Sequence, residues 1–219
     1  MELERRVVLW IAGVPVTTTV VSTTGMVVVL SVLAVLAGRT IRARPSRWQA
    51  VAEWGVRGVE GLLDEVVGDG RRYLPLVATL GLFILVANLM SALPAVEAPT
   101  ADVNTPAALA IIVFCSVHYY GMREAGVLGY FRRFTQPVPL LLPINILSNL
   151  TRTFSLAIRL FGNMVSHQII VAILLLILPL LVPAVLEVFG MFISVLQAYI
   201  FTVLTIVYIG GAVRAGGEL

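Results

Sequence analysis

Residues 160–186 read LFGNMVSHQIIVAILLLILPLLVPAVL, a run of 27 residues without Asp, Glu, Lys or Arg. A helix needs about 20 consecutive apolar residues to cross a bilayer. Four more uncharged runs are long enough: 7–38, 73–96, 103–122 and 188–213, with 32, 24, 20 and 26 residues. Hydrophobic residues make up 59% of the 219-residue chain and charged residues only 12%. The sequence therefore predicts an all-α integral membrane protein with five main hydrophobic helical segments.

These runs predict a single membrane domain over 1–219. We expect the first span at 16–37, the second at 72–93 and the third at 105–121. The last two helices, 143–178 and 181–213, should form a long antiparallel hairpin, because Pro179 and Pro183 mark a turn between them. The first run is too long for a cleaved signal peptide, so we expect it to remain in the mature protein.

Residues 46–67 differ from the spans because polar residues recur there at helical spacing. Their positions are Gln49, Glu53, Arg57, Glu60 and Asp64. Apolar residues fill the opposite side, which predicts an amphipathic helix on the cytoplasmic interface, with Trp48 and Trp54 near the lipid headgroups. Ser46 is the expected N-cap and Gly68 the expected end. The alternative is a helix that simply packs on other helices.

Basic residues gather in alternate loops, which predicts the orientation. Loops rich in arginine stay in the cytoplasm. Four arginines follow the first span, two precede the second, and further ones follow the third span and the last helix, whereas 94–104 contains Glu97 and Asp102 and no base. We therefore expect the N-terminus outside and the C-terminus in the cytoplasm. The net charge of +3 is spread over several loops, so it gives no reason to expect nucleic acid.

The hairpin carries very few ionisable groups. Leaving the tyrosines aside, they are Arg152, Arg159, His167 and Glu187 over 135–213. An arginine at the centre of a membrane helix costs about 2.5–3.5 kcal/mol on insertion scales, so it usually faces a partner or water. Arg152 is nearer the predicted cytoplasmic end, where an arginine can also reach the interface.

Two polar stripes follow from helical spacing, one on each helix of the hairpin. The first consists of Ser148, Arg152, Ser155, Arg159, Asn163 and Ser166, with His167 at its edge, and the side opposite holds Phe154, Leu156, Leu160, Phe161 and Val165. The second consists of Glu187, Gly190, Ser194, Phe201, Thr205 and Tyr208, with Gln197 at its edge. The stripes can face one another or a shared third body. His167, Glu187, Asn163 and Gln197 could also serve as hydrogen-bonding contacts between helices.

Four motifs in order carry a resemblance to a known family. They are LVANLM (85–90), PTADVNT (99–105), SLAIRLFGNM (155–164) and LQAYIFTVLT (196–205). Together they resemble subunit a, the stator of the F-type ATP synthase membrane motor, over nearly the whole chain. The resemblance implies that Arg159 faces a rotating ring of c subunits, that Ser155, Asn163 and Gln197 support it, and that two half-channels lead ions to and from the ring.

The physics of an arginine agrees with that role. A permanent guanidinium favours the ionised form of an approaching carboxylate and repels a cation that would cross directly between channels. The chain departs from the family at four positions: Gln168 and Gly190 replace frequent Glu or His residues, Asn145 stands where an acid is frequent, and Thr153 stands where Pro is frequent. We therefore expect Glu187 and His167 to serve the outer half-channel in an altered arrangement, with Ser194 and Gln197 along the route inward.

The resemblance also implies partners and location. We expect the c-subunit ring, peripheral stalk b subunits and a bacterial plasma (inner) membrane around a multi-pass chain. We expect neither a cofactor nor a small-molecule substrate, and no enzymatic activity, because the chain has no phosphate-binding loop. The transported ion should be H⁺, with Na⁺ as the alternative. Two other classes remain open: an independent secondary ion transporter, of which the internal repeats are not found, and a structural assembly subunit.

Overall fold

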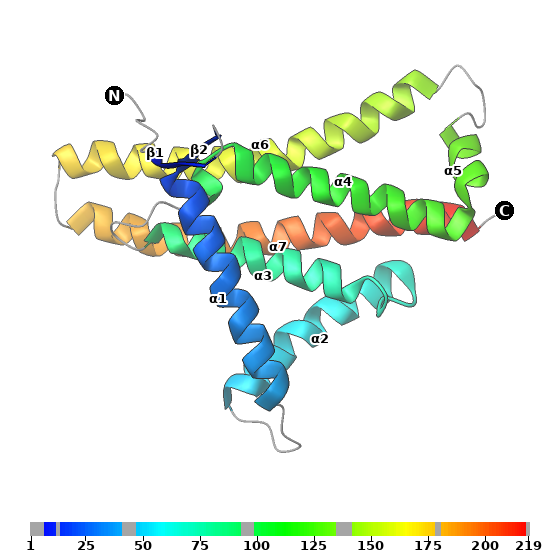
Figure 1. Ribbon diagram of the computed structural model, residues 1–219, viewed down its shortest axis with the longest axis horizontal. Helices are drawn as coiled ribbons and strands as arrows, with labels where there is room; N and C mark the ends of the chain where they lie inside the picture. Colours follow the sequence, from blue (N-terminus) through cyan, green and yellow to red (C-terminus); the bar gives the residue numbers. More distant parts are fainter. Residues whose placement is uncertain are drawn as a thin grey trace.

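The computed structural model describes residues 7–11, 14–40, 47–92, 99–134, 142–177 and 181–217, and these residues are nearly all helical (Figure 1). Four described helices are long and apolar enough to cross a membrane. They are α1 (Thr18–Thr40), α4 (Asn104–Ala125), α6 (Leu142–Ile177) and α7 (Leu181–Gly217). The predicted all-α membrane fold is confirmed.

The second predicted span is shorter than expected. Helix α3 covers Leu74–Leu89, 16 residues with Pro75 in its first turn, where proline's missing N–H costs no hydrogen bond. A 3₁₀ turn, η1 (Met90–Ala92), continues it, and a second one, η2 (Pro99–Ala101), precedes α4. The apolar helix is thus shorter than the interval 72–93 that we predicted.

Three further elements were not predicted. Strands β1 (Val7–Ile11) and β2 (Val14–Thr17) pair antiparallel directly before α1. They lie inside the uncharged run 7–38, and hydropathy alone does not distinguish an apolar strand from the start of an apolar helix. The short helix α5 (Val127–Phe134) follows α4 after Gly126, whose φ of 73° breaks the helical path.

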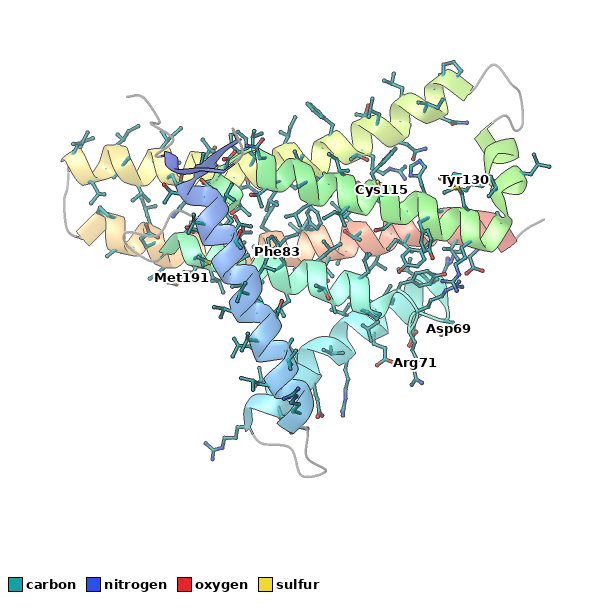
Figure 2. The ribbon with its side chains drawn as sticks, viewed as in Figure 1. Asp69, Arg71, Phe83, Cys115, Tyr130 and Met191 are labelled. Atoms are coloured by element: carbon teal, nitrogen blue, oxygen red, sulfur yellow. The ribbon has the colours of Figure 1, made fainter. Side chains whose placement is uncertain are left out.

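Helices α3, α4, α6 and α7 lie side by side along the long axis, whereas α1 crosses them steeply (Figure 1). Their common core contains apolar residues from all four helices: Leu80, Ile84, Leu109, Ala110, Val113, Leu156, Leu160, Ala198 and Phe201. Phe83, labelled in Figure 2, lies against this core and also lines the groove where α1 crosses α3. The packing fixes which side of α6 is left exposed.

The amphipathic helix α2 (Arg47–Val67) is present and ends at Gly68, whose φ is 93°. Arg57 and Glu53 form an ion pair along the helix, with Arg57 Nη2 3.4 Å from Glu53 Oε2, while the expected N-cap Ser46 lies outside the described residues. The second half of α2 packs on α3 and α7 through Leu63, which is fully buried. In the first half Trp54 remains 80% exposed. The second half of α2 is therefore a helix packed on other helices, and the exposed first half is available to lie at a membrane interface.

The last two helices form the antiparallel pair that the sequence predicts. Helix α6 begins at Leu142 and α7 at Leu181, each within one residue of the predicted start. Pro183 lies in the first turn of α7, where a proline is tolerated, and Pro179 lies outside the described residues. Both helices exceed 35 residues.

Ion pairs tie the helices together at one end of the bundle. Arg72 pairs with Glu124, joining the start of α3 to the end of α4. Arg71, labelled in Figure 2, lies with its Nε 3.1 Å from Glu60 Oε1 of α2. Arg214 at the end of α7 donates to the backbone carbonyl of Glu65. This end is therefore the polar, arginine-bearing end of the bundle.

Candidate functional site

The polar stripe of α6 lies on the exposed side of the bundle. The exposed members are Ser148, Arg152, Ser155, Arg159, Asn163 and Ser166, which is the whole stripe apart from its edge residue His167. On the other side, Leu156 is 2% exposed and Leu160 is 1% exposed. Phe154 departs from the predicted apolar side, since it is 65% exposed. Packing of Leu156 and Leu160 on α3, α4 and α7 therefore turns the polar stripe outward.

Arg159 lies near the middle of the 36-residue α6. Among the residues that the structure describes, it has no ion pair and no hydrogen-bonding partner. A guanidinium stays charged under all physiological conditions and has five N–H donors. Within an apolar helix, such a group needs an anion or water from outside this chain.

The polar stripe of α7 has the opposite environment and points into the bundle. Ser194 is 7%, Gln197 4%, and Thr205 0% exposed. Thr205 donates to the Phe201 carbonyl of its own helix, and Ser194 Oγ lies 3.5 Å from the backbone oxygen of Asn88 on α3. The two stripes therefore neither face one another along their whole length nor share one exposed face.

The stripes meet at an amide pair. Asn163 Nδ2 of α6 donates to Gln197 Oε1 of α7 over 2.8 Å. The Gln197 Nε2 atom is buried and lacks a hydrogen-bond partner in the structure. A buried amide donor without a partner is costly, so this atom is a place for water or a further group. The pair lies one helical turn from Arg159, on the side toward the α6–α7 turn.

A second contact between the stripes joins His167 to Glu187. His167 Nε2 lies 3.5 Å from Glu187 Oε2. The two facing atoms are both buried, and neither has a hydrogen-bond partner in the described structure. A protonated imidazole would make this contact an ion pair, and a neutral one would leave room for exchange of a proton. The sequence prediction that these two residues act together is thus compatible with their positions.

A small cavity connects these two contacts. It has a volume of about 20 Å³ and is lined by Asn88, Ser91, Leu160, Asn163, Met164, His167, Gly190, Ile193, Ser194 and Gln197. A space of this size holds about one water molecule. Its lining includes His167 and both residues of the amide pair.

Asn88 is a site residue that our sequence reasoning did not select. It belongs to α3, is 2% exposed, and its Oδ1 has no hydrogen-bond partner in the described structure. Asn88 and Gln197 line the same cavity, and each has a buried polar atom without a hydrogen-bond partner in the described structure. The signal was available, because Asn88 is a lone amide inside the uncharged run 73–96.

Arg152 is placed differently from Arg159. Its Cζ lies 4.7 Å from the centre of the Tyr208 ring on α7, a cation–π contact. Arg152 is therefore held against the neighbouring helix, which leaves Arg159 as the arginine of the stripe without a partner in the described chain. Ser155, one turn before Arg159, is exposed on the same face.

Comparison with known proteins decides the family. The family described as ATP synthase A chain matches residues 19–210. The chain belongs to this family. Subunit a 2 of the ATP synthase of Bradyrhizobium sp. strain BTAi1 is 45% identical over 204 residues, which cover 93% of this chain and 92% of that protein. The corresponding subunit a of Moorella thermoacetica is 41% identical over 202 residues, or 92% and 93% of the two chains.

Membership accounts for the overall character of the molecule. The chain is a multi-pass membrane subunit of an F-type ATP synthase, a complex of ATP synthesis and ion transport. Subunit a 2 of Pelobacter propionicus, 44% identical over 90% of this chain, agrees with the same family. The resemblance that the sequence motifs carry is confirmed.

Proposed function

We propose that this chain is the stator of the membrane motor and couples ion flow to rotation of a ring of c subunits. The observation that carries the proposal is Arg159, a charged and exposed guanidinium near the middle of a 36-residue apolar helix with no partner in the described chain. A carboxylate presented by another membrane subunit would satisfy it. Exposure of the whole α6 stripe gives such a ring a continuous polar face to pass.

In this proposal Arg159 acts by electrostatics alone. When a c-subunit carboxylate arrives, the guanidinium favours its ionised form, so the ion it carries is released. The same charge repels a cation that would cross directly from one half-channel to the other. Each charge that crosses a membrane potential of 100 mV then supplies about 2.3 kcal/mol to rotation. Ser155, one turn earlier on the same exposed face, would lie beside the passing ring.

The outer half-channel in this proposal follows the contacts between α6 and α7. An ion would enter at Glu187 near the α6–α7 turn, pass His167 and the cavity beside Ser194, and reach the amide pair of Asn163 and Gln197. Support comes from the 3.5 Å imidazole–carboxylate contact and from the one-water cavity that joins it to the amides. In this proposal the α6–α7 turn lies outside and the arginine-bearing end lies in the cytoplasm.

We propose the proton as the transported ion. An imidazole and a carboxylate exchange protons readily, and one water bridges the remaining step. Na⁺ is the second candidate and would need several oxygen ligands, which the c subunits would have to supply together with the carboxylate. No ATP chemistry is assigned to this chain, so nucleotide binding and hydrolysis belong to other subunits.

The test is purification followed by reconstitution. An affinity tag on this chain should recover c subunits and the peripheral stalk b subunits, and the complex in liposomes should make ATP when a proton gradient is imposed. Recovery of the chain alone, with ion transport by the isolated chain, would instead identify an independent transporter. Assembly of a fully active complex without this chain would leave it only an accessory role.

A further inference from the structure

Helix α5 lies across one end of the bundle instead of along it (Figure 1). Helix α4 ends at Ala125, and Gly126, with a φ of 73°, turns the chain before α5 begins at Val127. The backbone N–H of Tyr130 then donates to the Gly126 carbonyl over 2.9 Å, which closes the first turn of the new helix. Because α4, α6 and α7 are long enough to cross a membrane, a helix that crosses their ends runs along the membrane surface.

The length of α4 gives the depth of α5. Helix α4 has 22 residues, which span about 33 Å at 1.5 Å per residue. The hydrocarbon core of a bilayer is about 30 Å thick. The end of α4 and the start of α5 therefore lie where the hydrocarbon gives way to the lipid headgroups.

Tyr130, labelled in Figure 2, fixes α5 to the bundle and is only 5% exposed. A Cβ atom built on Gly121 of α4 would lie 2.6 Å from Tyr130 Cε2 and 3.3 Å from Ala212 Cβ of α7. The His118 ring contacts the Tyr130 ring edge-on, with the centroids 5.8 Å apart. At about 100° per residue, Leu128 lies nearly opposite Tyr130 around the helix. Packing of Tyr130 therefore turns Leu128 away from the bundle.

The first turn of α5 exposes two large aliphatic side chains. Val127 is 62% exposed and Leu128 is 87% exposed. Contact of such side chains with water is unfavourable, and contact with lipid removes this cost. Their place at the level of the headgroups is the one that interfacial helices use to bury an apolar face.

Basic residues accompany these aliphatic side chains. Arg132 and Arg133 belong to α5, and the exposed Arg123 lies in the last turn of α4. Glu124 is the only acid between positions 118 and 134, and it pairs with Arg72. The segment therefore has an excess of positive charge at the membrane surface, which attracts anionic lipids.

We propose that α5 is an interfacial helix that inserts Val127 and Leu128 among the lipids at the arginine-bearing end of the bundle and binds the headgroups of anionic phospholipids. This inference goes beyond the proposed function, because it requires only that the chain crosses a membrane. Helix α5 stands between α4 and α6 in the chain, so its contact with lipid holds the approach to α6 at a fixed depth.

The experiment measures quenching of a single tryptophan by brominated lipids in phosphatidylcholine vesicles that contain the full chain. The three native tryptophans are replaced by phenylalanine, and Leu128→Trp supplies the fluorophore. Brominated phosphatidylcholine should quench it, and brominated phosphatidylglycerol at the same mole fraction should quench it more. Each arginine near the surface favours an anionic lipid by about fivefold. Arg132→Gln with Arg133→Gln should therefore remove most of the preference.

Leu176→Trp is the matched control. Leu176 is 88% exposed, as Leu128 nearly is, but it lies in the stretch 160–186, which contains no Asp, Glu, Lys or Arg. The two brominated lipids should quench this tryptophan equally. Circular dichroism of each variant measures whether the helical fold is retained.

Three results would overturn the lipid-binding role of α5. In Leu128→Trp, quenching by aqueous iodide without quenching by either brominated lipid would show that α5 does not lie on the membrane. Equal quenching by the two brominated lipids, with both arginines present, would remove the preference for anionic headgroups. In the assembled complex, a photoreactive group on Leu128→Cys in a Cys115→Ser background should cross-link to lipid, and an adduct with another subunit would identify a protein as the occupant. None of these results bears on Arg159, so they are distinguishable from failure of the proposed function.

Discussion

The amide pair between α6 and α7 offers a prediction with a calculable size. Replacing Asn163 by leucine removes the donor to Gln197 Oε1, which lies 2.8 Å away. Gln197 is 4% exposed and its Nε2 already has no partner in the structure. Asn163→Leu would therefore leave both polar ends of a buried amide unpaired.

The environment determines the size of the loss. In water-soluble proteins an unsatisfied buried group costs about 1–3 kcal/mol. Between membrane helices the measured coupling is smaller, about 0.6 kcal/mol on average and about 1.7 at most, because the unfolded helices also find partners. Because Gln197 is almost fully buried, we expect the upper part of that range, which is a factor of roughly 3 to 18 in the unfolding equilibrium.

The assay is unfolding of the full chain by SDS in mixed micelles, followed by loss of helical signal. Asn163→Leu should lower the free energy of unfolding more than the double variant Asn163→Leu with Gln197→Leu, since the second change removes the orphaned amide. Thr205→Val is the control, because Thr205 is buried on α7 but donates only within its own helix. If the single variant is no less stable than the double, the amide pair does not link the two helices.

Three further predictions concern exposure and ion transfer. The exposed Cys115 (Figure 2) is first replaced by serine. In that background, a Cys introduced at Ser155, Asn163 or Ser166 should react with a polar thiol reagent faster than one at Leu156 or Leu160, which are 2% and 1% exposed. Equal rates would contradict the outward-facing stripe. Glu187→Gln should reduce proton-driven ATP synthesis by about 100-fold or more, as loss of a proton-transfer group does. Glu187→Asp should keep part of the synthesis rate. Normal synthesis by Glu187→Gln at limiting driving force would show that this carboxylate has a structural role only. With Trp10 and Trp48 replaced by phenylalanine, the fluorescence comes from Trp54 alone, which is 80% exposed. Lipids brominated near the headgroup should quench it. Quenching only by aqueous iodide would show that α2 does not lie on the membrane.

Much of the fold could be predicted because membrane helices are read from single runs of residues. The uncharged runs and the prolines give the starts of α6 and α7 to within one residue. Hydropathy does not distinguish a strand from a helix, so it failed to predict the elements that depend on this distinction. Strands β1 and β2 lie in an apolar run that a helix would fit equally well, and α5 is an eight-residue helix too short to give a reliable period.

The sequence predicted which residues form the candidate site, but not which faces of the helices are buried. Helical spacing places Arg159, Asn163 and Ser155 on one face of α6, and all three are exposed together. Spacing does not state which face of α7 is buried, since that depends on how α3 and α4 pack against it. The close contact of α7 with the His167 ring, in which a Cβ built on Gly190 would lie 2.3 Å from the ring Cε1, depends on tenths of an ångström between two helices, which a one-dimensional pattern does not contain.

The central claim is that Arg159 couples ion flow to rotation, and one measurement tests it most directly. Assembled complexes carrying Arg159→Ala, and as a matched control Arg152→Ala, are reconstituted in liposomes and assayed for ATP synthesis under an imposed proton gradient. Arg152 is seven residues earlier on the same stripe but contacts Tyr208, so its loss should leave measurable synthesis. Arg159→Ala should abolish synthesis while the complex remains assembled. Synthesis at the wild-type rate by an assembled Arg159→Ala complex would contradict the role assigned to this arginine.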